Sequence, residues 1–303
     1  MIDPEDRLVS LKGSYFGDPD IPTTQCFCNV WDWDQLRMIK IEGTAKIFPP
    51  EEDKKLAIVA QFADYFSHDI RAISVDDNGL LTGVSTNPED DTRHVGHIPI
   101  SLCDSIATSS KIKFSEIQSL DRLGPGVDLV LIPTEDKKVV FKFNPLELPP
   151  RPEMAWKEIN ILSKLPPHPN LIPFDRIVLE DIESRVIGFT TRYITCQPLS
   201  TASDRPFRLT WLQQLTQLVD FLNLELGIMH QDIAPRNLLI DSNTERILPF
   251  DFDWAANAKE TLEEGRDDIS SLAFTLYEII TKDTQFTDIP HWERSIDMVQ
   301  NIE

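Results

Sequence analysis

The sequence predicts an α+β protein, in which a mostly β section precedes a mostly α section and an α/β region comes before both. Short runs rich in β-branched and aromatic residues, separated by turn residues, recur up to about residue 194. Stretches with helical periodicity occupy much of the chain after residue 209. The pattern changes near residue 110, and motifs tied to chemistry occur only after it. We therefore expect two domains, 1–110 and 111–303.

Composition excludes some classes of partner. The 303 residues are 41% hydrophobic and have a formal net charge of −21, so the surface repels nucleic-acid phosphates and anionic lipids. No apolar run approaches the ~18 residues of a spanning helix, and the acidic N-terminus lacks the apolar core of a signal peptide. Cys26 and Cys28 have no second ligand pair at zinc spacing, which favours reduced thiols in a cytoplasmic protein, with the nucleus as the alternative.

The first 110 residues show local elements and no chemical motif, so a recognition or regulatory role is expected from position only. Pro50 and the carboxylates up to Asp53 are typical of a helix start. Asn78-Gly79 supplies the positive φ angles of a tight hairpin turn. In order, these patterns predict strands within 26–47, a helix over 56–66, a hairpin over 73–81 and a loop over 85–93.

The later section begins with strands and continues with helices. Pro133 to Lys137 separates two β-rich runs, Pro166-Pro167 ends a helical stretch, and Gly227 ends another, as C-terminal glycines do. The predicted elements are strands over 127–132 and 138–143, a helix over 154–165, a strand over 186–194 and a helix over 209–226.

One segment carries most of the chemical information. His230 to Ile240, with the letters HQDIAPRNLLI, resembles the protein-kinase catalytic loop H-R-D-x-x-x-x-N. The resemblance implies that Asp232 accepts or orients the acceptor hydroxyl proton and that Asn237 holds Mg²⁺ through its amide oxygen. It places Arg236 near the phosphate being transferred, as in tyrosine kinases.

A second segment supplies the other metal ligand. Asp251-Phe252-Asp253 is similar to the kinase D-F-G segment with aspartate in place of glycine, which makes Asp251 a ligand that bridges Mg²⁺ to the β and γ phosphates. The spacing from Asn237 suits a pair of strands between the two segments. Asp253 adds a further carboxylate where a metal could bind.

Upstream residues complete the resemblance. Val139-Val140-Phe141-Lys142 is similar to the strand that carries the ATP lysine, and Lys142 among apolar residues needs an anionic partner, for which Glu158 is the natural choice. Leu123 to Val127 resembles the glycine loop, and His168 to Ile172 the H-P-N-I segment. Thr191 corresponds to the gatekeeper, followed by the hinge. The implied ATP contacts are Gly124, Gly126, Val127, Val140, Lys142, Thr191, Tyr193 and Ile194.

Six such landmarks occur in kinase order, the last being Asp268 to Glu278, which resembles the buried helix D-x-W-S-x-G-x-x-L-Y-E. The sequences of these motifs are similar to those of kinase-like proteins of filamentous fungi. The resemblance implies a bilobal fold with a β-rich lobe over 111–192 and an α-rich, shortened lobe over 193–303. It also implies ATP and Mg²⁺ as ligands and catalytic roles for Asp232, Arg236, Lys142 and Glu158.

Several positions depart from the kinase pattern. Leu129 and Asp128 occupy the third glycine and the aromatic position of the glycine loop, and Gln231 replaces the arginine that grips a phosphorylated activation loop. The stretch from Asp251 to Asp268 is short and has no A-P-E. Three functions remain open: a protein kinase, a small-molecule kinase of the aminoglycoside or choline type, and a pseudokinase. The sequence leaves the acceptor and the oligomeric state open.

Overall fold

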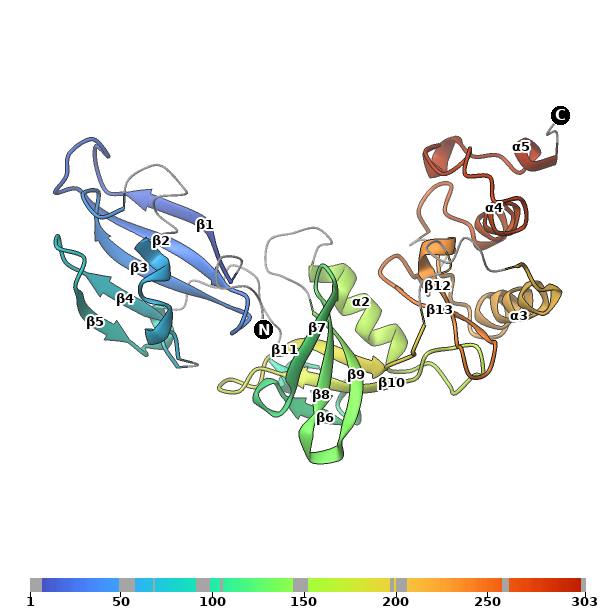
Figure 1. The fold of residues 1–303 in the computed structure, drawn as a ribbon, viewed down its shortest axis with the longest axis horizontal. Coiled ribbons are helices and arrows are strands. Elements are labelled where there is room, and N and C mark those ends of the chain that lie inside the picture. Colours follow the sequence, from blue (N-terminus) through green and yellow to red (C-terminus); the bar gives the residue numbers. More distant parts are fainter. Residues whose placement is uncertain are drawn as a thin grey trace.

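The computed structural model describes residues 7–48, 58–67, 69–90, 99–103, 106–143, 152–196, 199, 206–257 and 262–300. The fold is mixed α+β, with a five-stranded sheet, a six-stranded sheet, a two-stranded sheet and a group of helices that follow one another along the chain (Figure 1). None of the helices described is both long enough and apolar enough to cross a bilayer.

The first sheet has its strands in chain order. It comprises β1 (Leu8–Tyr15), β2 (Gln25–Asp32), β3 (Arg37–Thr44), β4 (Ala72–Val75) and β5 (Leu81–Ser85). Neighbouring strands are antiparallel except β3 and β4, which run parallel. The strands predicted within 26–47 are confirmed as β2 and β3, whereas β1 was not predicted. The short turn η1 (Ala63–Tyr65) lies in the stretch for which a helix was expected, and its predicted start at residues 50–53 lies outside the described residues.

The β4–β5 hairpin is confirmed, but its turn differs from the predicted one. Gly79 has a φ of +76°, whereas Asn78 is not among the residues with positive φ. The Asp76 carboxylate instead accepts hydrogen bonds from the N–H groups of Asn78 and Leu80, both at 2.9 Å. An aspartate that caps its own turn thus replaces the second left-handed residue. Residues 88–90 form η2 within the predicted loop, and 91–93 lie outside the described residues.

The second sheet has the order β6-β10-β11-β9-β8-β7. Its strands are β6 (Lys111–Lys113), β7 (Gln118–Gly124), β8 (Val127–Ile132), β9 (Lys137–Phe143), β10 (Phe174–Leu179) and β11 (Val186–Arg192). The predicted strand-turn-strand is confirmed as β8 and β9, and the predicted strand over 186–194 is β11. The helix α2 (Pro152–Leu162) ends three residues before the predicted Leu165 and lies beside this sheet (Figure 1).

Both faces of the six-stranded sheet are covered. Along β9, Val139, Phe141 and Phe143 are buried in one cluster that also contains Trp31 and Met38 from the first sheet. The opposite side contributes to a second cluster, in which Cys103 and Ile106 meet Ile159 of α2. Residues on either side of position 110 therefore share hydrophobic cores, and the division of the chain at 110 stays a prediction.

The helical section follows β11. Helix α3 (Leu209–Asp220) continues into a π-helical turn, η7 (Phe221–Glu225), and Gly227 follows with a φ of +66°, so the predicted helix is confirmed with a looser last turn. The expected strand pair is present as β12 (Leu238–Ile240) and β13 (Ile247–Pro249). Helix α4 (Asp268–Thr281) confirms the last predicted helix, and α5 (Asp297–Gln300) comes after it.

Candidate active site

The alternation of β9 places Lys142 on the face of the sheet that α2 covers. Val139, Phe141 and Phe143 are buried on the other face, so Val140 and Lys142 share the remaining one. Val127 lies directly opposite Lys142 on β8, and Thr191 lies opposite Val140 on β11. Because cross-strand partners point to the same face, these four predicted ATP contacts are brought together.

Three carboxylates surround the ammonium group of Lys142. Its Nζ lies 2.9 Å from Glu158 of α2, 2.5 Å from Asp251 Oδ1 and 2.7 Å from Asp253 Oδ1. The Lys142 side chain is 19% exposed and that of Glu158 is 2% exposed, so these charges interact with little screening by water. The predicted pair of Lys142 and Glu158 is present, and two aspartates from a segment over one hundred residues away join it.

The charge balance at this cluster shifts the pKa values of its members. Burial lowers the pKa of Lys142, but Glu158, Asp251 and Asp253 outweigh it and hold that pKa above its ordinary value. Burial raises the pKa of Glu158 and of Asp251, despite the favourable charge of Lys142. The pKa of Asp253 is lowered, since Lys142 and a hydrogen bond with Glu158 outweigh burial. One lysine thus does not neutralise the three acids.

The same carboxylates could hold a divalent cation. Each of Glu158, Asp251 and Asp253 offers one oxygen, and these three oxygens lie within 4.8 Å of one another. Hard oxygen donors suit Mg²⁺, which binds through one or two carboxylates and keeps several waters. The donor chemistry therefore fits the predicted magnesium ligand Asp251, with Asp253 as a second candidate.

A second group of predicted residues gathers around Asp232, which is 6% exposed. The Asn237 amide donates to Asp232 Oδ2 at 2.7 Å and to its carbonyl at 2.9 Å. Arg236 donates to Asp232 Oδ1 at 2.6 Å, and Arg266 approaches the same oxygen at 3.4 Å. The turn η8 (Pro235–Asn237) produces this arrangement, because it folds Asn237 back onto the loop that it closes.

Buried Asp268, the first residue of α4, binds the backbone of the loop that contains His230 and Gln231. Its carboxylate accepts hydrogen bonds from the backbone N–H groups of His230, at 2.8 Å, and Gln231, at 2.7 Å. Gln231 has a φ of +63°, a strained conformation for a non-glycine residue that these bonds stabilise. His230 is fully buried and its Nε2 lies 3.2 Å from the carbonyl of Phe250, so the ring packs as part of the core.

The side chain of Gln231 ties the loop to the following segment. Its amide nitrogen donates to the carbonyl of Trp254 at 2.6 Å, and its amide oxygen accepts from the N–H of Glu263 at 2.7 Å. Arg266 stacks on the Trp254 ring at 3.7 Å. Neutral hydrogen bonds thus fix this segment from the position where the kinase pattern has an arginine.

Backbone hydrogen bonds connect the two groups. The N–H of Phe250 donates to the carbonyl of Asn237 at 3.0 Å, and the N–H of Phe252 donates to Glu158 at 3.1 Å. Asp251 lies between these anchors with a φ of +65°. The positions of Asp251 and Asn237 are therefore coupled through the β12–β13 pair.

The predicted glycine loop forms a tight turn. Gly124 pairs with Val127, and Gly126 between them has a φ of +68°, as a Pro-Gly turn requires. Asp128, at the aromatic position of the kinase glycine loop, does not share the face of Lys142. Its carboxylate instead bonds Arg122, at 2.9 and 3.3 Å, on the face of the sheet opposite Lys142.

The predicted hinge follows β11. Ile194 is 9% exposed, and Tyr193 is half-buried beside it. The Leu199 N–H donates to Leu238 of β12 at 2.8 Å, which leads this connection toward the catalytic-loop side. Tyr193 and Ile194 thus lie on the link between the sheet and the helical section.

Two contacts were missed by sequence reasoning. Asp253 was considered as a metal ligand but not as a partner of Lys142, and Arg266 was not considered at all. Cys26 and Cys28 are buried, and the described residues place neither in a group that could hold a metal.

No protein-family model matches the chain, and no curated protein matches it. A function for the chain is therefore inferred from the geometry of its own residues.

Proposed function

We propose that the chain is a phosphotransferase that binds ATP and Mg²⁺ and transfers the γ-phosphate to a hydroxyl group, with a protein as the first candidate acceptor. One observation carries the proposal. Lys142, Glu158 and Asp251, which three separate segments contribute, meet at 2.5 to 2.9 Å. A lysine held by a helix glutamate beside a metal aspartate is the arrangement that kinases use at ATP phosphates.

Each residue then has a distinct role. Lys142 binds the α and β phosphates, and Glu158 positions its ammonium group. Asp232 orients the acceptor hydroxyl and accepts its proton, while Arg236 stabilises charge on the phosphate being transferred. Asn237 and Asp251 would hold Mg²⁺, which when bound neutralises the β and γ oxygens. The face shared by Val127, Val140 and Thr191 would receive the adenine.

The arrangement of elements supports a two-lobed, kinase-like fold. The six-stranded sheet and α2 form one body, and α3, α4 and the β12–β13 pair form the next along the chain (Figure 1). Lys142 and Glu158 come from the first body, whereas Asp232, Asn237 and Asp251 come from the second. A nucleotide held by both sets would lie where the bodies meet.

A small-molecule acceptor is the second candidate, and Arg266 favours it. Together with Arg236, it covers Oδ1 of Asp232, whose side chain is 8% exposed. The backbone of His291 and Trp292 packs against Gly265, where an added Cβ would lie 2.5 Å from the His291 carbonyl oxygen. A narrow approach to Asp232 admits a small alcohol more easily than a peptide.

Binding and transfer are tested separately. ATP with Mg²⁺ should raise the melting temperature of the purified chain, because a ligand that binds only the folded state stabilises it. Turnover of ATP is then measured with protein substrates and with a panel of small alcohols. Asp232→Ala should keep the thermal shift and lose turnover by a factor of about 10² to 10⁴.

Asp288→Asn provides the control, since it removes an exposed carboxylate from the same section of the chain. It should leave both measurements unchanged. A shift without turnover on any acceptor would identify a pseudokinase. A melting temperature unmoved by ATP and Mg²⁺ would refute the proposal altogether.

A further inference from the structure

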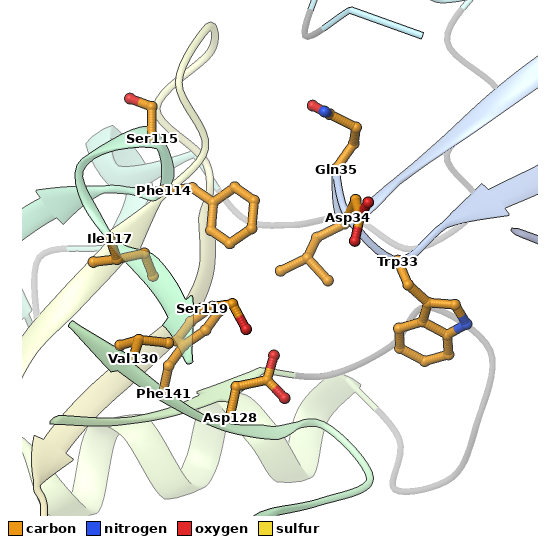
Figure 2. Close-up of a pocket in the computed structure, with 11 residues that line it drawn as sticks. Trp33, Asp34, Gln35, Phe114, Ser115, Ile117, Ser119, Asp128, Val130 and Phe141 are labelled. Carbon is orange, nitrogen blue, oxygen red and sulfur yellow. The ribbon is translucent and has the colours of Figure 1, made fainter. Parts of the chain in front are cut away.

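A cavity of about 290 Å³ lies on the face of the six-stranded sheet opposite Lys142. One wall is the turn between β2 and β3, and the other consists of β7, β8, β9 and η5 (Phe114–Glu116). Figure 2 shows Trp33 and Asp34 across the space from Phe114, Ser119 and Asp128. Small-molecule sites usually begin at about 300 Å³, so the cavity suits one compact molecule.

The walls offer flat apolar surfaces. The rings of Phe114 and Phe141 lie 6.0 Å apart at 43°, and Val130 lies beside Phe141 on the floor (Figure 2). Trp33 closes one side, where its ring is also covered by the Arg122 guanidinium at 5.3 Å. These groups would contact both faces of a small aromatic or aliphatic ring.

The charged groups at the rim are not balanced. Arg7 bonds Asp32 at 3.0 and 2.7 Å, and Arg122 bonds Asp128 at 2.9 and 3.3 Å, so each arginine is already committed to one aspartate. Asp34 reaches only the Nε of Arg7, at 3.4 Å, which leaves it without a full partner among the described residues. Two arginines therefore serve three aspartates.

The lining also contains an acceptor that lacks a donor. The side-chain oxygen of Gln35 is buried and has no hydrogen-bond donor in the part of the chain that the structure describes. Burial raises the pKa of Asp34, and the charge of Arg7 offsets this only in part. A positively charged donor group would satisfy Asp34, whereas an anion would meet uncompensated negative charge.

We propose that this cavity is a binding site for a small protonated amine with a flat apolar body. The ammonium group binds Asp34, and the ring lies between Phe114 and Trp33. The site is separate from the candidate active site, because Phe141 lines the cavity while the next residue, Lys142, points to the opposite face. The proposal therefore does not depend on phosphotransfer.

Three indole compounds test the chemistry. Tryptamine has an ammonium group, tryptophol a neutral hydroxyl and indole-3-acetate a carboxylate on similar frameworks. Calorimetric titration of the full chain should show tryptamine binding at least about tenfold more tightly than indole-3-acetate, with tryptophol between them. Equal affinities for the cation and the anion, or no binding of tryptamine, would overturn the proposal.

Substitutions at Ser119 and Asp34 test whether tryptamine binds in this cavity. Ser119→Trp fills the cavity from an exposed position on β7 and should abolish tryptamine binding, whereas Ser119→Ala should retain it. Asp34→Asn should weaken binding severalfold, and Asp288→Asn, which changes the net charge equally, should not. Tryptamine that binds Ser119→Trp as tightly as the wild type would bind elsewhere and refute the assignment. The melting temperature of each unliganded variant confirms that it is folded.

Discussion

Strand β9 begins with Lys137 and carries Lys142 near its end, and the surroundings of these two lysines differ in charge balance. Lys137 bonds Asp175 at 2.5 Å, and Arg176 bonds Asp175 at 2.8 Å and Glu135 at 2.8 and 3.0 Å. Two cations there meet two carboxylates. Lys142, by contrast, bonds three carboxylates by itself, those of Glu158, Asp251 and Asp253.

The pKa values reflect this difference. Burial alone would raise the pKa of Asp175, but hydrogen bonds from Lys137, Arg176 and Thr190 lower it below the ordinary value. At the other end of the strand, burial keeps the pKa of Glu158 and Asp251 raised. A balanced network stabilises the folded chain at neutral pH, whereas the surplus of acids around Lys142 costs stability and favours binding of a further cation.

The largest effect is expected for Lys142→Met. It leaves three acids without their cation and should cost about 3 kcal/mol of unfolding free energy at pH 7.5. The loss should be smaller at pH 5, because carboxyl groups with raised folded-state pKa values take up protons as the pH falls and relieve the repulsion. Urea unfolding at the two pH values measures both. Lys138→Met, on the same strand and exposed, is the control. Equal unfolding free energies of the two variants would mean that the three carboxylates around Lys142 do not depend on its charge.

A divalent cation should produce the next effect. Mg²⁺ at ten times its dissociation constant should stabilise the wild type by about 1.4 kcal/mol, relative to NaCl of equal ionic strength. Asp253→Asn should reduce this gain, since it removes one of three oxygens within 4.8 Å of one another. Asp175→Asn should retain it. Thermal melting with and without Mg²⁺ checks the prediction, and a gain unaffected by Asp253→Asn would remove Asp253 from the site.

Asp175→Asn should have a smaller effect and lower the unfolding free energy by about 1 kcal/mol at pH 7. Lys137 is 40% exposed, so solvent screens part of its interaction with Asp175. The folded-state pKa of Asp175 lies below its ordinary value of 3.8. Its contribution is therefore present above pH 3.8 and is lost as the pH falls further. Chemical unfolding from pH 7 to pH 3 should show wild type and variant converging. A difference that grows on acidification would contradict the assignment.

Glu135→Gln should have the smallest effect. Glu135 is exposed, so its bonds with Arg176 are screened by water. We expect no measurable change in urea midpoint at physiological salt and a slight decrease at low salt. A clear loss at both salt concentrations would show that the network depends on Glu135 as well as on Asp175.

Local patterns predicted much of the fold. The alternation of β8 and β9, the periodicity of α3 and the Pro-Gly turn before Val127 each have a direct physical signal. Strand β10 was missed because Asp175 and Arg176 interrupt its apolar run, and these charges are tolerated only through partners distant in sequence. Strand β1 was also missed, and its pairing with β2 has an irregularity between Ser10 and Lys12.

The candidate site was predictable where one residue type requires another. A buried lysine requires an acid, which led to Glu158, whereas Asn237 was found through the resemblance of residues 230–240 to the kinase catalytic loop. Contacts that arise from the packing of whole elements could not be predicted. Arg266 reaches Asp232 only because Trp254 supports its guanidinium, and no spacing in the sequence indicates that.

The carboxylate of Asp268 has a consequence for how the chain matures during synthesis. It holds the backbone of His230 and Gln231, which are made 38 and 37 residues earlier. Until α4 has emerged and docked, nothing else described in the chain accepts those two N–H groups, and the positive φ of Gln231 is unsupported. The sheet that carries Lys142 precedes both segments. A nascent chain would therefore complete the strands that carry Lys142 first and the loop that carries Asp232 last, so the proposed phosphate transfer would begin only after α4 is in place.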